Sequence, residues 1–129
     1  MIKKLDHFVI TTNRLQECLD FYSTLGFTPI TKNNRHELRC GTFKFNVHIS
    51  GKEFSPHAEN VIPGSADFCL EVDDDMDTLL RNLKKKGVSV IKGKCTKFGF
   101  RGQMTSIYLR DPDGNLVELC SYDQITSEE

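Results

Sequence analysis

The sequence predicts an α+β fold built from two βαβββ modules. The chain has 129 residues, which suits one compact domain with its own hydrophobic core. Strand-like segments with alternating apolar residues and helix-like segments with apolar residues three or four positions apart follow one another in the same order twice. The two halves also align with each other at an interval of about 60 residues, which indicates two copies of one module.

The first module is expected over about residues 1–50. Its segments read as strand, helix, strand, strand and strand, over residues 4–12, 13–26, 27–31, 36–41 and 43–50. Asn13 and Gln16 have the spacing of a capping box, and Gly26 is expected to end the helix. A segment rich in turn residues, 51–64, should link this module to the second and form a wall or a crossover that includes His57.

The second module is expected over about residues 65–124, with a short tail at 125–129. Its segments follow the same order, over residues 65–72, 73–87, 88–93, 104–110 and 116–122. Acidic residues at the start of the helix and lysines at its end complement the helix dipole. Pro112 and Gly114 favour a tight turn before the last strand, so a hairpin should end the module.

Each module should have one apolar and one polar sheet face, because successive strand residues point to opposite sides. In the segment 43–50, Asn46 and His48 lie opposite a row of four apolar residues. In the segment 65–72, Asp67 lies on the side opposite the apolar residues. The helix of each module is expected to cover the apolar face, which leaves the polar face to curve around a ligand.

Glu118 lies in a strand whose neighbours are all apolar. A carboxylate is depleted in strands and costly to bury, so it faces water, has a charged or polar partner, or binds a ligand. The first and last strand of each module offers one side chain able to bind a metal: His7, His48, Asp67 and Glu118. Two imidazoles and two carboxylates suit a divalent ion such as Zn²⁺, Ni²⁺, Co²⁺, Mn²⁺ or Fe²⁺.

Three motifs, "DHFVI", "LDFYSTLGF" and "DPDGNLVEL", resemble those of the vicinal-oxygen-chelate superfamily, which includes glyoxalase I, bleomycin-resistance proteins and extradiol dioxygenases. The resemblance covers nearly the whole chain and is narrower to the group around glyoxalase domain-containing protein 5. It implies a cup-shaped, partly open mixed sheet with the helices outside. It also implies a divalent metal on four strand positions, which fall on His7, His48, Asp67 and Glu118 in that order.

The resemblance implies a metal-dependent lyase or isomerase that acts on a small oxygenated metabolite, with Glu118 or Asp67 as the general base. Two alternatives stay open. With Fe²⁺, two histidines and a carboxylate could support an extradiol-type dioxygenase. A protein of the bleomycin-resistance type would instead bind a ligand without turnover.

Residues 94–105 read as a loop in which Gly99 and Gly102 flank Phe100 and Arg101. An aromatic ring and a guanidinium on a mobile loop could close over an anionic or planar substrate. Phe100, Arg101 and Asn46 are therefore candidate substrate-binding residues. An ordinary polar connection remains the alternative for this loop.

The net charge of −1 does not favour a nucleic acid or an anionic membrane as partner, so small molecules are the expected ligands. The apolar runs fall short of the roughly 20 residues of a membrane span, and the N-terminus lacks the features of a secretory signal. A cytoplasmic location is therefore expected, and the five scattered cysteines read as reduced thiols. A homodimer is expected because half-cups of this family commonly associate, with exchanged or unexchanged modules.

Overall fold

The computed structural model describes residues 1–122; the predicted tail at 125–129 and the last residues of the second module lie outside them. The order βαβββ occurs twice, which confirms the predicted fold class. The first set is β1 (His7–Thr12), α1 (Leu15–Thr24), β2 (Thr28–Lys32), β3 (Arg35–Cys40) and β4 (Phe43–Ile49). The second set is β5 (Asp67–Glu71), α2 (Met76–Lys85), β6 (Lys92–Gly99), β7 (Gly102–Arg110) and β8 (Leu116–Ser121).

The chain folds into two compact units, each with one four-stranded sheet. Unit 1 contains residues 1–66 together with the turn 111–115, and unit 2 contains residues 67–110 and 116–122. The strand orders, β1-β4-β3-β2 and β5-β8-β7-β6, are the same in both units. In each, the first and last strands of the module are parallel neighbours and the remaining pairs are antiparallel.

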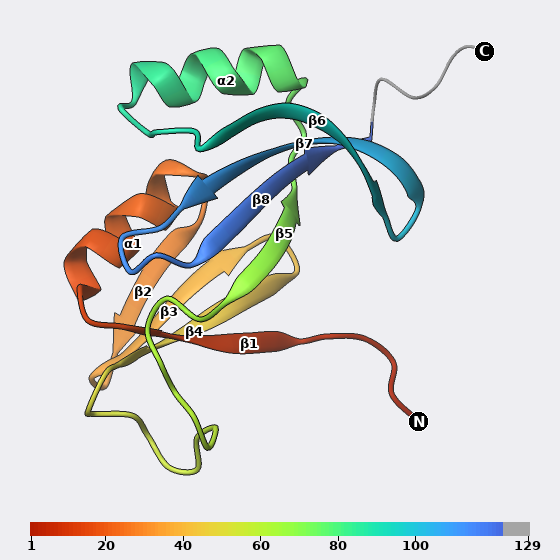
Figure 1. The fold of residues 1–129 in the computed structure, drawn as a ribbon. Coiled ribbons are helices and arrows are strands. Elements are labelled where there is room, and N and C mark those ends of the chain that lie inside the picture. Colours follow the sequence, from red (N-terminus) through yellow and green to blue (C-terminus); the bar gives the residue numbers. More distant parts are fainter. Residues whose placement is uncertain (123–129) are drawn as a thin grey trace. The chain divides into compact units, whose positions relative to one another are not determined.

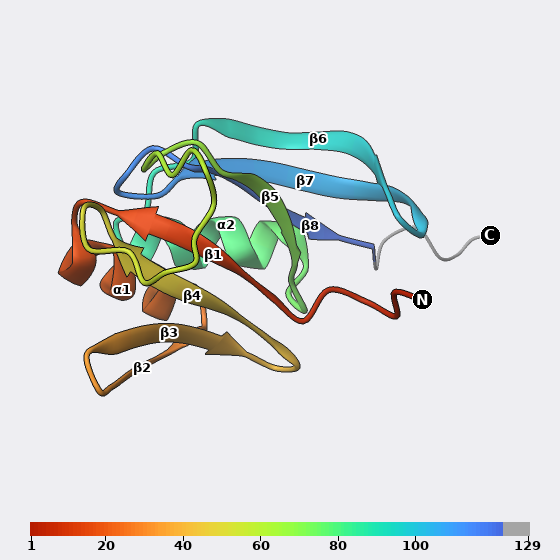
Figure 2. The same ribbon diagram turned by 90° about the horizontal axis from the view of Figure 1, so that it is seen from below.

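In unit 1, α1 and the linker between β4 and β5 lie on opposite faces of the sheet (Figures 1 and 2). The face toward α1 is aromatic: the rings of Tyr22 and Phe45 lie 5.6 Å apart edge to face, and those of Phe8 and Phe45 lie 4.6 Å apart. Tyr22 and Phe45 are fully buried. Such ring pairs stabilise a core beyond the area they bury, so this cluster fixes α1 on the apolar face.

The turn 111–115 docks onto α1 through a buried carboxylate. Asp111 is 4% exposed and accepts hydrogen bonds from the Tyr22 hydroxyl at 2.7 Å and from the backbone and side-chain amides of Asn115 at 2.9 and 2.7 Å. Burial, followed by the charge of Asp111, raises the pKa of Tyr22 far above its ordinary value, so the phenol stays a donor. This contact explains why the turn between β7 and β8 belongs to unit 1.

The predicted capping box at α1 is wrong. Arg14 occupies the N-cap position without a side-chain cap bond, and the Gln16 amide donates to Asp20 instead. The carboxylate of Asp113 instead holds the chain just before the helix: it accepts from the backbone N–H of Asn13 at 2.9 Å and from the Thr12 hydroxyl, whose oxygen accepts from the backbone N–H of Arg14. Because this carboxylate comes from a distant turn, the local spacing of polar residues does not reveal it.

In unit 2, α2 lies alongside the sheet and buries Met76, Leu79 and Leu83 (Figure 1). Asp75 caps the helix by accepting from the backbone N–H of Thr78. Two sequence predictions are corrected here. The strand expected at 88–93 begins only at Lys92, and the loop expected at 94–105 is a hairpin in which β6 and β7 pair up to the tip at Gly99 and Gly102.

Both helices have ten residues, and in the described part of the chain no helix is long and apolar enough to span a membrane.

Candidate metal and ligand sites

The polar face of each sheet carries the candidate metal ligands. In unit 1, His7 and Val9 of β1 share this face with Asn46 and His48 of β4, since paired residues point the same way. In unit 2, Asp67 and Cys69 of β5 share it with Glu118 of β8. Each unit therefore offers candidate ligands from its first and last strands, as the alternation of side chains predicts.

The strand register separates His7 from His48. His7 pairs with Lys44, whereas His48 pairs with Thr11, four residues further along β1. Four strand residues span about 13 Å, so these two imidazoles are not neighbours in unit 1. Asn46, which pairs with Val9, lies two residues closer to His7 on the same face.

The same register in unit 2 identifies the equivalent positions. Glu118 pairs with Cys69, two residues beyond Asp67, just as Asn46 pairs with Val9, two residues beyond His7. By this register Asn46 is the counterpart of Glu118 in the repeat, whereas the strand-to-strand match made from the sequence took His48. A shift of two residues leaves every side chain on the same face, so side-chain alternation cannot detect it.

Glu118 is half-buried, and its Oε2 atom is buried without a hydrogen-bond partner among residues 1–122. Tyr108 lies opposite it on β7, and burial followed by the charge of Glu118 raises the pKa of that phenol. Burial also raises the pKa of the neighbouring Cys69 thiol, and the next cause is its hydrogen bond with Cys120. A buried carboxylate oxygen without a partner is costly, so this position fits a residue that binds a ligand or an ion.

The remaining candidate ligands are more exposed. The Nδ1 atom of His7 lies 2.7 Å from a carboxylate oxygen of Asp6, and this contact lowers the pKa of Asp6. Asp67 is exposed at the start of β5. Neither unit, as far as residues 1–122 go, brings three His, Cys, Asp or Glu side chains together in a group that could hold a metal. The donor types fit a divalent ion, and each unit contains two of the four candidate ligands.

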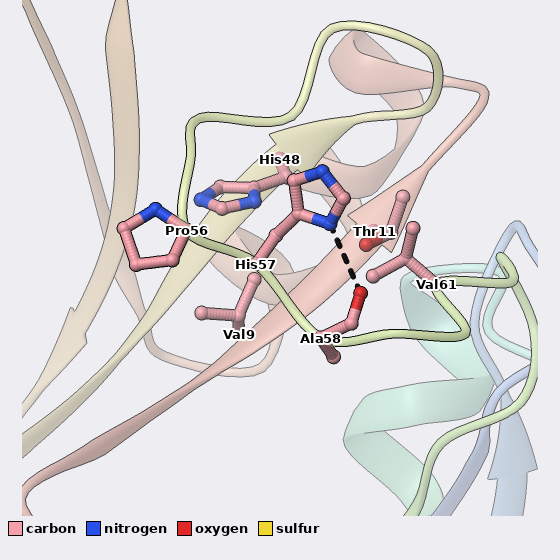
Figure 3. Close-up of a pocket in the computed structure, with 7 residues that line it drawn as sticks. All are labelled: Val9, Thr11, His48, Pro56, His57, Ala58 and Val61. Carbon is pink, nitrogen blue, oxygen red and sulfur yellow. Dashed lines mark hydrogen bonds between the residues drawn. The ribbon is translucent and has the colours of Figure 1, made fainter.

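A second site lies wholly within unit 1, where a pocket of about 470 Å³ opens between β1, β4 and the linker. Figure 3 shows the side chains that line it: Val9, Thr11, His48, Pro56, His57, Ala58 and Val61. The Nδ1 atom of His57 lies 2.9 Å from the backbone oxygen of Ala58. The linker thus forms the wall expected from the sequence, and His48 belongs to this pocket as well as to the polar face.

His48 has a half-buried imidazole whose Nδ1 atom is buried without a partner in the described chain. Burial lowers its pKa below the ordinary value of 6.5, and the charge of Glu53 only partly opposes this effect. The unfolded chain therefore binds a proton more readily at this position than the folded chain does. Stability supplied by neutral His48 is complete above pH 6.5 and decreases as the pH falls from there toward the lower folded pKa.

We therefore expect the free energy of unfolding to fall on acidification below about pH 6.5, and to fall less steeply in a His48→Gln variant. Urea unfolding at a series of pH values measures this slope. His36→Gln, which removes an imidazole bonded to Thr31 in the same sheet, controls for a general effect of substitution. Parallel pH profiles for the parent and His48→Gln would contradict the assignment.

The structure places Phe100 and Arg101 at the tip of the β6–β7 hairpin. Phe100 is fully exposed. Arg101 is already engaged: its guanidinium donates to both carboxylate oxygens of Glu71 at 3.1 and 2.7 Å and lies 4.1 Å from the ring centre of Tyr122. The pKa of Glu71 is lowered chiefly by this pair. Any substrate contact by Arg101 has to compete with Glu71, a partner that the sequence reasoning missed because it lies 30 residues away.

Comparison with known proteins assigns the family. The profile of the Glyoxalase/Bleomycin resistance protein/Dioxygenase superfamily matches residues 4–119. The chain is 39% identical over 122 residues to Glyoxalase domain-containing protein RDO1 of Mycosarcoma maydis, covering 94% of this chain and 69% of that protein. It is 37% identical over 124 residues to Virulence protein STM3117 of Salmonella typhimurium, covering 95% of this chain and 86% of that protein.

Solved structures agree with this match. The crystal structure of STM3117 superimposes with a TM-score of 0.91 at 35% identity and covers 95% of this chain and 98% of its own. An integron cassette protein from Vibrio cholerae superimposes with a TM-score of 0.91 at 37% identity, again over 95% and 98% of the two chains. The protein therefore belongs to the glyoxalase/bleomycin resistance protein/dioxygenase superfamily, as the sequence resemblance predicts.

Proposed function

We propose that this protein is a divalent-metal-dependent lyase or isomerase that acts on a small oxygenated metabolite and works as a homodimer. The metal ligands in this proposal are His7, Asp67 and Glu118, with Asn46 in place of His48 at the second position. The observation that carries it is the buried, unpartnered Oε2 atom of Glu118 on the polar face, diagonal to Asp67. The matching offset of Asn46 from His7 in unit 1 supports the same set.

The chemistry assigned to these residues is proton transfer next to an activated oxygen. When bound, a divalent ion supplies Lewis acidity toward adjacent substrate oxygens. The Oε2 atom of Glu118 can accept a proton from a substrate carbon, because no described residue occupies this oxygen. Tyr108, beside Glu118 on the same face, stays protonated at neutral pH and can orient the carboxylate as a hydrogen-bond donor.

Metal content tests this proposal directly. Protein purified without added metal, and protein reconstituted with Mn²⁺, Ni²⁺ or Zn²⁺ and desalted, should each hold about one ion per chain by elemental analysis. Fe²⁺ as the native ion, together with oxygen consumption on a phenolic substrate, would replace the lyase proposal with a dioxygenase. Less than a tenth of an ion per chain after reconstitution would contradict metal dependence of either kind.

A ligand-binding protein without turnover is the second candidate, and a specific observation favours it. The pocket of unit 1 is mainly apolar, and its lining contains none of His7, Asp67 and Glu118. Such a pocket can retain a small molecule without any metal. Ligand binding that is unchanged by a chelator, combined with no metal-dependent conversion of the ligand, would select this candidate.

A further inference from the structure

We propose that the pocket of unit 1 binds a small, neutral and largely apolar molecule that carries a hydroxyl group. This inference rests on the second candidate function and names its ligand class; it is separate from the proposed metal chemistry, because the pocket is built from β1, β4 and the linker alone and its lining contains none of His7, Asp67 and Glu118.

The volume and the apolar walls of the pocket indicate the size and the apolar character of the ligand. A volume of about 470 Å³ lies in the range of small-molecule sites. Four of the seven lining residues are apolar: Val9, Pro56, Ala58 and Val61. They come from both sides, since Val9 lies on the sheet and the other three on the linker (Figure 3). A compact ring or branched hydrocarbon would therefore be in apolar contact on two sides.

The composition of the lining favours a neutral ligand. No lysine, arginine, aspartate or glutamate is among the seven residues, so neither a carboxylate nor an ammonium group would meet an opposite charge. Burying an unpaired charge costs far more than burying a hydroxyl that is hydrogen-bonded. The ligand of this pocket is therefore neutral at the pH at which it binds.

The histidines of the pocket indicate which polar group the ligand carries. A backbone carbonyl only accepts hydrogen bonds, so the Nδ1 atom of His57 must donate to Ala58 and carry the proton. In the neutral imidazole the Nε2 atom is then an acceptor. His48 adds a buried Nδ1 atom without a partner in the described chain, and the Thr11 side chain is buried beside them. A hydroxyl can donate to the Nε2 atom of His57, which an ether or a hydrocarbon cannot do.

Three probes of similar shape test this inference: 4-methylphenol, 4-methylanisole and toluene. The chain has four histidines, and two of them line the pocket. The imidazole NMR signals of the other two, His7 and His36, therefore serve as internal controls. The protein is treated with a chelator to remove any bound metal. The titration is done at about pH 8, where an ordinary imidazole is neutral. We expect 4-methylphenol to shift the His48 and His57 signals saturably, to leave those of His7 and His36 in place, and to bind about tenfold more tightly than the other two probes.

Two variants complete the test. Val61→Asp places a charge in the wall of the pocket, and His57→Ala removes the hydrogen-bond acceptor. Each should weaken the binding of 4-methylphenol at least about tenfold. His36→Gln should leave this binding unchanged. Equal affinity for all three probes would overturn the hydroxyl assignment. Absence of saturable shifts at millimolar probe, or equal shifts at all four histidines, would overturn the site itself. These outcomes are independent of the metal content that tests the proposed function.

Discussion

Replacement of Asp111 by alanine is expected to lower the free energy of unfolding by about 3 to 5 kcal/mol. The carboxylate is 4% exposed and accepts hydrogen bonds from the Tyr22 hydroxyl and from the backbone and side-chain amides of Asn115. Its removal leaves the buried phenol and these amides of Asn115 without their acceptor. Each unsatisfied buried donor costs about 1 to 3 kcal/mol, and water has little access to replace the lost bonds.

Urea unfolding followed by circular dichroism measures this effect. Tyr22→Phe removes one of the donors and should cost less, about 1 to 2 kcal/mol. Asp20→Ala is the matched control, because Asp20 is an exposed carboxylate that accepts from Gln16 on the surface of α1. A loss of stability in Asp111→Ala no larger than in Asp20→Ala would show that the turn 111–115 does not hold α1 as described.

Substitution of Glu118 by glutamine is expected to weaken divalent-metal binding at least about a hundredfold. Glutamine keeps the shape of the side chain but removes the negative charge, which strengthens the binding of a divalent ion by a carboxylate. The Oε2 atom is buried and lacks a partner among residues 1–122, so the amide would place an unpaired donor or acceptor at the same point. Titration calorimetry with Ni²⁺ or Zn²⁺ on chelator-treated protein measures the affinity.

Two further variants decide between the positions on β4. Asn46→Ala should weaken metal binding and His48→Gln should leave it unchanged, because Asn46 has the register of Glu118 relative to the first strand of its unit. His36→Ala controls for loss of a surface imidazole. The reverse result, in which His48→Gln weakens metal binding and Asn46→Ala does not, would show that the metal ligand on β4 is not the residue equivalent to Glu118. Unchanged affinity in Glu118→Gln would make Glu118 a structural carboxylate.

Periodicity was sufficient to predict the order of the elements. Apolar residues at spacings of two or of three and four recur in both halves, and the structure has the order βαβββ twice. The same spacing predicts which side chains share the polar face, including Asp67, Asn46 and Glu118. These properties depend on the geometry of a single strand or helix, which residues close together in the sequence specify.

The hairpin at residues 94–105 shows where local reasoning fails. Gly99, Gly102 and the polar residues around them are typical of a loop, yet β6 and β7 pair up to these two glycines. Pairing between strands supplies the backbone hydrogen bonds that composition does not reveal. The bidentate bond between Arg101 and Glu71 arises in the same way, since it joins residues 30 positions apart.

Strand composition and alternation specify the two modules and the polar face of each sheet, because both follow from contacts within a few residues. Register, the contact of Asp113 with the chain just before α1 and the pocket under the linker depend instead on segments far apart in the chain. A strand displaced by two residues keeps the same face but changes every neighbour, and only pairing within the folded sheet selects one register. For this reason the sequence indicates Glu118 as a site residue, while the structure distinguishes Asn46 from His48 and places His48 beside His57.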